Sequence, residues 1–197
     1  MPGIAAILLA AGNASRMGSP KQLMEFGGKP LLRRAAETAL ASQCSLVIAV
    51  LGAHASAVGQ ALKELPVTIV ENDQWAEGMG TSIQAGLRAA VKAGADAVIL
   101  TLADQPLVLA EFLDRLIDIH RESGRPIVAA RYAGTVGVPV LFSKEYFSKL
   151  TALRPAQGCK GVILADPGNA FLVDCPEAEF DVDTPQDFLR LKALQEG

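Results

Sequence analysis

The feature that most constrains the fold is an alternation of short apolar runs with amphipathic, helix-like segments. Four runs rich in aliphatic side chains have the length of buried strands, at residues 4–9, 46–51, 67–70 and 97–102. Strands that are apolar throughout are buried on both faces, which is typical of parallel sheets with helices on either side. The pattern therefore predicts an α/β fold, a Rossmann-like three-layer α/β/α sandwich with a mostly parallel sheet.

The segments between these strands carry helical signals. Helices are expected to open at Pro30, to span 55–65, to start at Thr81 or Ser82, and to span 109–120. Right-handed crossovers then put the loops after the first and fourth strands at one edge of the sheet, where ligands bind in such folds. The pattern weakens late in the chain, where we predict strands at 126–130, at 138–142 and near Phe171, a helix near Phe147, and a last helix from 185 to about 194.

Composition narrows the class of protein. The chain has 197 residues, 50% of them hydrophobic and 20% charged, which suits one domain with a continuous core. The formal net charge of −3 gives no basic footprint, so no nucleic-acid partner is expected. Cys44, Cys159 and Cys175 lack C-x-x-C spacing, which argues against a zinc site and a disulfide framework and fits a reducing, cytoplasmic compartment. No stretch approaches the length of a membrane span.

The loop that leaves the first predicted strand combines small residues with two cations. Ala10, Ala11 and Gly12 would let a ligand approach the backbone closely, and Arg16 and Lys21 follow. A loop with free backbone N–H groups and two positive charges suits a polyanion such as a triphosphate. The alternative is an ordinary loop with solvated charges, but the combination of these residues favours the triphosphate.

Two familiar phosphate loops do not fit this segment. A Walker A loop has four residues between its glycines and then Lys and Ser or Thr, whereas five residues separate Gly12 from Gly18, and Ser19 follows. The dinucleotide fingerprint G-x-G-x-x-G fails because residue 14 is Ala, and no acidic residue follows Leu51 at the end of the second strand.

Two further segments place carboxylates where they can act. Asp104 directly follows the fourth strand, and a carboxylate facing a phosphate loop is a natural Mg²⁺ ligand. A turn Asp that caps the next helix is an equally good reading of that position. Asp181 and Asp183 alternate, so on an extended segment both point to one face, while Thr184 and Asp187 suit the cap and first turn of the last helix.

Three motifs together resemble a known family. Residues 9–21 read L-A-A-G-x-x-x-R-M-G-x-x-K, residues 72–86 read N-x-x-W-x-x-G-x-x-x-S-x-x-x-G, and residues 181–187 read D-x-D-T-P-x-D. These are similar to motifs of the MobA/MocA-like nucleotidyltransferases of molybdenum-cofactor maturation, within the NTP-transferase superfamily. The resemblance spans residues 7–187 and implies a fold of the nucleotide-diphospho-sugar transferase type.

The resemblance implies transfer of a nucleotidyl group from an NTP to a phosphate monoester, with release of pyrophosphate. It implies Arg16, Lys21 and Asp104 as catalytic residues, the two cations holding the leaving β- and γ-phosphates. It also implies Mg²⁺ on Asp104 and Asp183, with Asp181 as a further carboxylate. The nucleotide-binding residues it implies are Leu9, Ala10, Ala11, Gly12, Arg16, Lys21, Asn72, Gly78, Gly80, Ser82 and Asp104.

The base and the acceptor are separate inferences. The Ala10-Ala11-Gly12 turn resembles the cytidylyltransferase branch and favours CTP over the GTP of MobA-like guanylyltransferases. The acceptor implied is molybdopterin, with a molybdoenzyme or its chaperone as a further partner. One domain, 1–197, is expected, with a nucleotide-binding half to about residue 107 and an acceptor-binding half from about 108.

The acceptor side departs from the family. Gly137-Val138-Pro139 stands where G-H-P is common, and Gly158-Cys159-Lys160 opens a stretch where G-D-x-G-A-R is common. Gln105, Pro139 and Lys160 remain as acceptor candidates. The departure favours the alternative of another phosphorylated acceptor, such as a sugar or polyol phosphate. A nucleotide-binding module without turnover is a third reading, and the retained Arg16, Lys21, Asp104 and Asp183 argue against it.

Overall fold

A seven-stranded sheet forms the centre of the computed structural model, which describes residues 3–13 and 20–194. Its strands lie in the order β5-β4-β1-β6-β8-β7-β9. Only β8 runs antiparallel to its neighbours, so the prediction of a mostly parallel sheet is confirmed. The strands are β1 (Gly3–Ala10), β4 (Leu46–Leu51), β5 (Thr68–Glu71), β6 (Ala95–Leu102), β7 (Ile127–Tyr132), β8 (Thr135–Ser143) and β9 (Ala170–Asp174).

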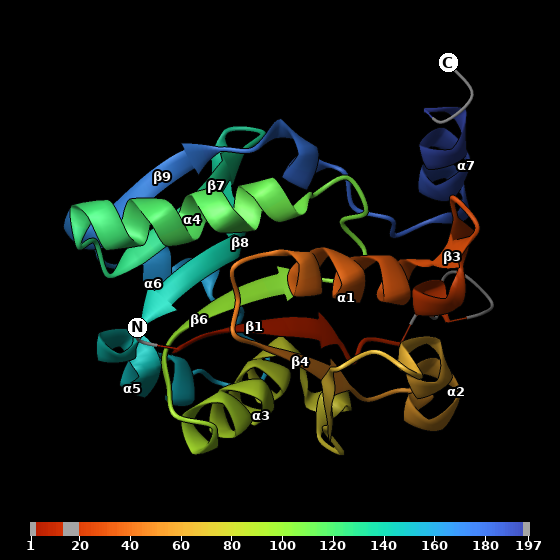
Figure 1. Ribbon diagram of the computed structural model, residues 1–197, viewed down its shortest axis with the longest axis horizontal. Coiled ribbons are helices and arrows are strands. Elements are labelled where there is room, and N and C mark those ends of the chain that lie inside the picture. The colour runs from red at the N-terminus through yellow and green to blue at the C-terminus, as the bar shows by residue number, and fades with distance from the viewer. Residues whose placement is uncertain (1–2, 14–19, 195–197) are drawn as a thin grey trace.

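Helices cover both faces of this sheet and complete the predicted three layers (Figure 1). One face carries α1 (Leu31–Ala41), α2 (Ala55–Gly59) and α4 (Ala110–Ser123). The other carries α3 (Met79–Lys92), α5 (Phe147–Thr151) and α6 (Lys160–Leu164). Short 3₁₀ helices connect the elements: η1 (Lys21–Leu23), η2 (Gln60–Leu62), η3 (Trp75–Glu77), η4 (Lys144–Tyr146), η5 (Pro167–Asn169) and η6 (Pro176–Glu179).

The burial of β1 explains why its sequence is apolar without interruption. Ile7 and Leu9 join the core under α3, whereas Ala6 and Leu8 join the clusters under α1. Successive side chains of a strand point to opposite faces, so a strand covered on both sides cannot alternate apolar with polar residues. Within the described residues, no helix has the length and apolar character needed to cross a bilayer.

The last helix, α7 (Pro185–Ala193), packs outside the three layers. It lies against the hairpin of β2 (Glu25–Phe26) and β3 (Lys29–Pro30) through a small cluster of Phe26, Leu31, Val182, Phe188 and Leu191. Its predicted cap is confirmed, because the Thr184 hydroxyl accepts from the Asp187 N–H while the Asp187 carboxylate accepts from the Thr184 N–H. This packing fixes where the preceding segment, 181–183, crosses the sheet edge.

Some predicted boundaries were wrong for local reasons. The helix expected at 55–65 ends its α-helical part at Gly59, and Glu64 then takes a φ of 71° before Pro66. α3 begins at Met79 rather than Thr81 or Ser82, because Gly78 is its N-cap. Helix α6 was not predicted. Strand β8 begins at Thr135 instead of 138, because a two-residue turn with positive φ at Ala133 and Gly134 joins it to β7.

The register of the central strands brings three segments to one edge. Leu9 of β1 pairs with Val50 of β4 and Leu102 of β6, so the loops after β1 and β6 leave the sheet side by side, as predicted. The segment before α7 returns to the same edge, where the Val182 N–H donates to the Asp104 carbonyl oxygen at 3.0 Å. Residues 10–13, 103–106 and 181–183 are therefore neighbours despite their distance in sequence.

The close approach of α3 to the sheet depends on Gly86. A Cβ at this position would lie 2.4 Å from Cγ2 of Ile7, a fully buried and stiff side chain. We expect Gly86→Ala to lower the free energy of unfolding by about 1–2 kcal/mol, because overpacking outweighs the gain in helix propensity. Urea denaturation measures the change.

Gly161→Ala is the matched control, since Gly161 is also helical and a Cβ there would meet nothing within 4 Å. It should leave stability unchanged or raise it by up to about 1 kcal/mol. Equal effects of the two substitutions would contradict the packing account.

Candidate functional site

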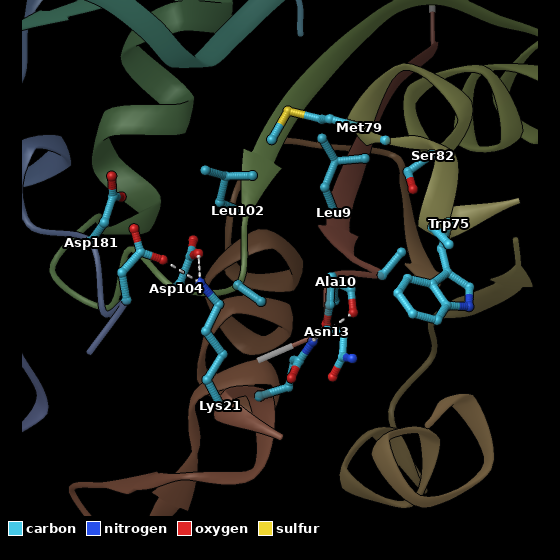
Figure 2. Close-up of a pocket in the computed structure, with 17 residues that line it drawn as sticks. Leu9, Ala10, Asn13, Lys21, Trp75, Met79, Ser82, Leu102, Asp104 and Asp181 are labelled. Atoms are coloured by element: carbon cyan, nitrogen blue, oxygen red, sulfur yellow. Dashed lines mark hydrogen bonds and ion pairs between the residues drawn. The ribbon is translucent and has the colours of Figure 1, made fainter. Parts of the chain in front are cut away.

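A cavity of about 520 Å³ opens at the sheet edge where the three segments meet. Figure 2 shows Lys21, Asp104 and Asp181 on one side of it and Trp75 and Ser82 on the other, with Leu9, Leu102 and Met79 between. Ten residues predicted for the site line this cavity: Leu9, Ala10, Ala11, Gly12, Lys21, Gly78, Ser82, Asp104, Asp181 and Asp183.

Lys21 connects the two carboxylates predicted for the metal. Its Nζ lies 2.5 Å from Oδ2 of Asp104 and 2.7 Å from Oδ1 of Asp183 (Figure 2). The side chains of Lys21 and Asp104 are only 18% and 17% exposed, so solvent screens this pair weakly, whereas Asp183 is 59% exposed. Lys21 is thus the counter-charge of both carboxylates, and its contact with the leaving phosphates stays a prediction.

The ion pairs set the charge state of Lys21. Burial disfavours the ammonium, but attraction to Asp104 and hydrogen bonds to both carboxylates outweigh it and raise the pKa of Lys21. The lysine is therefore a permanent cation at neutral pH, and it holds the segments of Asp104 and Asp183 together.

Asp181 lies in a different environment. Burial raises the pKa of its carboxyl to about 6, with a further contribution from the charge of Asp104. One oxygen of Asp181 and one of Asp104 are buried without a hydrogen-bond partner in the described part of the chain. Unpartnered buried oxygens of this kind are available to a ligand.

These oxygens fit a divalent cation of the Mg²⁺ type. Mg²⁺ prefers hard oxygen ligands and is commonly held by one or two carboxylates together with phosphate oxygens and water. Asp104 and Asp183 supply two such carboxylates around one position, which the Lys21 ammonium occupies. Among the described residues, no group of three or more His, Cys, Asp and Glu side chains is arranged to hold a metal.

The turn after β1 is held by hydrogen bonds that other residues donate to its backbone carbonyl oxygens. The Gln22 side-chain amide donates to the carbonyl oxygens of Ala10 and Gly12, at 3.0 and 2.8 Å. The Ala11 carbonyl oxygen accepts from the Ala53 N–H at 3.1 Å. A Cβ on Gly12 would meet no described residue within 4 Å, which agrees with the expected space for a close-lying ligand. Arg16, predicted to share this site, lies outside the described residues.

Gly78 and Gly80 are glycines for a packing reason that the sequence did not indicate. A Cβ on Gly78 would lie 2.5 Å from the Pro155 carbonyl oxygen, and one on Gly80 would lie 2.4 Å from that of Arg154. The Gly80 N–H donates to Pro155 at 2.8 Å. The absence of a side chain at both positions therefore lets the loop after α5 pack closely against the start of α3. Gly78 also lines the cavity, but Gly80, predicted to bind nucleotide, does not.

Asn72 also acts indirectly in the structure. Its buried side-chain amide donates to the hydroxyl oxygens of Thr81 and Ser82, at 2.9 and 3.0 Å, and its side-chain oxygen Oδ1 accepts from the Gln74 N–H. It does not line the cavity, where the sequence had placed it as a nucleotide ligand. It orders the first turn of α3 and thereby the position of Ser82.

Trp75 both packs and faces the cavity. Sequence reasoning favoured packing, and the residue does pack against the main core while lining the cavity wall. A Cβ on Gly52 would lie 2.5 Å from Cβ of Trp75, so the missing side chain of Gly52 makes room for it. Asn13, Gln22 and Met79 also line the cavity and were not predicted, although each is next to or within a recognised motif.

The three acceptor candidates do not line this cavity. Gln105 is buried and donates to the Ala178 carbonyl oxygen at 2.9 Å. Pro139 is buried within β8 and follows a cis peptide bond, while Lys160 is exposed at the start of α6. The structure thus brings most of the nucleotide-side and all of the metal-side predictions to one cavity, and the acceptor-side predictions lie outside its lining.

The family profile of the MobA-like NTP transferase domain matches residues 6–169. The chain therefore belongs to the MobA-like NTP transferase family and is a nucleotidyltransferase by class. Nicotine blue oxidoreductase of Paenarthrobacter nicotinovorans is 35% identical over 97% of both chains. Molybdenum cofactor cytidylyltransferase of Escherichia coli is 26% identical over 98% of this chain and 97% of its own length.

Solved structures show the same fold. Rv0371C of Mycobacterium tuberculosis, in complex with manganese, is 32% identical with a TM-score of 0.75 over 97% of this chain and 98% of its own. A nucleotidyl transferase of Methanothermobacter thermautotroptrophicus reaches a TM-score of 0.84 over 99% of both chains at 23% identity. The predicted nucleotide-diphospho-sugar transferase type of fold is confirmed.

The raised pKa of Asp181 gives a direct test of the site's electrostatics. The side-chain carboxyl ¹³C resonance of Asp181 should titrate with a midpoint near pH 6 in the ligand-free protein. Asp104→Asn removes a nearby negative charge and should move that midpoint to lower pH. An unchanged midpoint in the variant would show that Asp104 does not act on Asp181.

Proposed function

We propose that this protein transfers CMP from CTP to a phosphate-monoester acceptor and releases pyrophosphate, with molybdopterin as the first acceptor to test. The observation that carries the proposal is the placement of Lys21, Asp104 and Asp183 beside the Ala10–Gly12 turn in one cavity. A cation, two carboxylates and an open backbone turn suit a triphosphate with its metal.

In the proposed reaction an acceptor phosphate oxygen attacks the α-phosphorus. The new bond joins that oxygen to the α-phosphorus. The bond between the α-phosphorus and the oxygen it shares with the β-phosphate breaks, and this oxygen keeps the electron pair and leaves with the pyrophosphate. The attacking oxygen is already anionic, so no general base is needed, and the described cavity lining contains no His or Cys. What the protein must supply is alignment and charge neutralisation.

Lys21 has the central role in this scheme. Its ammonium donates hydrogen bonds to both Asp104 and Asp183. We propose that on nucleotide binding the ammonium moves to the β- and γ-phosphates, with Arg16 as the second cation there. These two positive charges would then stabilise the leaving pyrophosphate.

Asp104 and Asp183 would hold the divalent cation, with Asp181 beside them. Mg²⁺, when bound, neutralises phosphate charge and polarises the phosphoryl group. The manganese complex of the similar Rv0371C supports a divalent cation in this family. The protein's part is to present two carboxylates once Lys21 has left them.

Two observations support CTP as the donor. The Ala10-Ala11-Gly12 turn resembles the cytidylyl branch, and a relative that matches nearly the full chain is named as a cytidylyltransferase. GTP remains the alternative base. We also infer that residues to about 107 bind the nucleotide and that the rest, apart from 181–183, meets the acceptor.

The acceptor is the less supported half of the proposal. Val138 and Cys159 stand where the family commonly has His and Asp, and Gln105, Pro139 and Lys160 lie outside the cavity lining. A sugar or polyol phosphate is therefore the alternative acceptor. If the product is a cytosine dinucleotide cofactor, a molybdoenzyme or its chaperone would receive it.

A second candidate function is a redox reaction, which the 35% identity to nicotine blue oxidoreductase favours. The two candidates differ in their products. Protein-dependent oxidation or reduction of nicotine blue, and no pyrophosphate with any NTP and acceptor, would favour the redox reaction.

Substitutions at the charged cluster test the first candidate. With CTP, Mg²⁺ and a reactive acceptor, Asp104→Asn and Lys21→Met should each lower pyrophosphate release by about 100-fold or more, because charge stabilisation is lost at the reacting phosphates. A coupled pyrophosphate assay measures the rate, and thermal unfolding checks that both variants fold.

Lys144→Met is the matched control for Lys21→Met. Lys144 also pairs with an aspartate, Asp96, at 3.1 Å, but on the exposed surface. Its loss should leave the rate unchanged. A fully active Asp104→Asn enzyme would contradict the proposal that this carboxylate holds the divalent cation.

The proposed movement of Lys21 predicts a change in metal affinity. Without nucleotide, Mn²⁺ must displace Lys21 from Asp104 and Asp183, so Lys21→Met should bind Mn²⁺ about tenfold more tightly than the wild type, as an ion-pair contribution of about 1.4 kcal/mol implies. Electron paramagnetic resonance of free Mn²⁺ measures this. Unchanged or weaker binding by the variant contradicts competition between the lysine and the metal.

A further inference from the structure

Gln22 is a buried amide beneath the turn after β1. It is 3% exposed and lies in η1, directly after Lys21. The side chains of these two neighbours leave η1 toward different parts of the site. Lys21 reaches Asp104 and Asp183, while Gln22 reaches the backbone of Ala10 and Gly12.

The bonds of Gln22 fix the orientation of its amide. Both partners are carbonyl oxygens, at 3.0 and 2.8 Å, so only the NH₂ end can face them. The remaining oxygen, Oε1, is buried without a partner in the described part of the chain. An unpartnered buried acceptor costs free energy, so the amide is a poor choice for stability alone at this position.

The geometry of the peptide group shows what these bonds achieve. In a trans peptide the carbonyl and the next N–H point in opposite directions. Because the carbonyls of Ala10 and Gly12 point at Gln22, the N–H groups of Ala11 and Asn13 point away from it. The intervening carbonyl, of Ala11, is held by the Ala53 N–H on the other side. Three consecutive peptide groups are thus fixed by protein donors.

We propose that Gln22 is a positioning residue that aims the N–H groups of Ala11 and Asn13 at the phosphates of the bound nucleotide. Ala11, Gly12 and Asn13 all line the cavity, and Gly12 leaves open space beside them. The inference rests on the proposed function, since it needs a phosphate ligand at this turn. Fixed backbone N–H groups bind phosphate without the entropy loss of ordering a loop.

The chemistry of position 22 explains why an amide is needed there. A carboxylate cannot donate to the two carbonyl oxygens, and it would add negative charge near Asp104 and the phosphates. Gln22→Glu should therefore weaken phosphate binding more than Gln22→Ala does. Gln22→Met keeps the size of the side chain without its donors and separates packing from hydrogen bonding.

Gln84 offers a matched control. Its amide also donates to two backbone carbonyl oxygens, those of Thr151 and Leu153, at 2.9 and 2.8 Å, but it does not line the cavity. Gln84→Ala should lower the melting temperature without changing phosphate binding. A purely structural role for Gln22 would give the same result at position 22.

The experiment is calorimetric titration with inorganic tripolyphosphate and Mg²⁺. We expect the dissociation constant to rise about tenfold or more in Gln22→Ala and Gln22→Met, further in Gln22→Glu, and less than twofold in Gln84→Ala. With a reactive acceptor, the KM for CTP should rise by a larger factor than kcat falls. Wild-type affinity in Gln22→Met, or equal losses in the Gln22 and Gln84 variants, would overturn the inference.

A measurement on the wild type covers the case in which the variants do not fold. Adding tripolyphosphate should shift the amide ¹H–¹⁵N resonances of Ala11 and Asn13 strongly. If tripolyphosphate binds and these resonances do not move, Gln22 does not position them, and the proposed function stands. If the wild type binds neither tripolyphosphate nor any NTP, both the inference and the proposed function fail.

Discussion

The contact of Lys21 with Asp104 and Asp183 is the interaction on which the site depends. It joins three segments that are far apart in sequence and meet only because β1 and β6 are paired in register and the chain returns to their edge before α7. Two carboxylates at one position repel each other, and a partly buried ammonium between them offsets much of that repulsion. The same ammonium is then the natural partner of an incoming phosphate, so one side chain can serve both the ligand-free and the liganded protein.

Most of the fold could be predicted from the sequence because its strands are buried on both faces and read as unbroken apolar runs. The edge at which the site lies followed from the alternation of strands and helices. Lys21 and Asp104 stood out because they follow predicted strands, and Asp183 was implied by the family resemblance of residues 181–187. The packing role of Gly78 and Gly80 could not be predicted, because the backbone that requires glycine there belongs to a loop about 75 residues later. Gln22 was missed because a buried amide bonded to carbonyls leaves no pattern in sequence.

The relatives show how far the fold leaves chemistry open. Relatives that match nearly the full length of this chain carry the names of a cytidylyltransferase and of an oxidoreductase. In this chain the edge of β1 and β6 carries charges suited to a triphosphate with its metal, while Val138 and Cys159 stand where the resemblance leads us to expect His and Asp. This division between the two ends of the site is expected when function resides in loops on a shared scaffold.

A crystal structure with CTP and Mn²⁺ would test the account most directly, because manganese can be located by its anomalous scattering. The account predicts a manganese peak coordinated by Asp104 and Asp183, the triphosphate against the backbone of Ala11–Asn13, and the Lys21 ammonium beside a phosphate instead of between the carboxylates. Manganese and nucleotide bound elsewhere, or Lys21 still bridging Asp104 and Asp183 with the triphosphate in place, would contradict it.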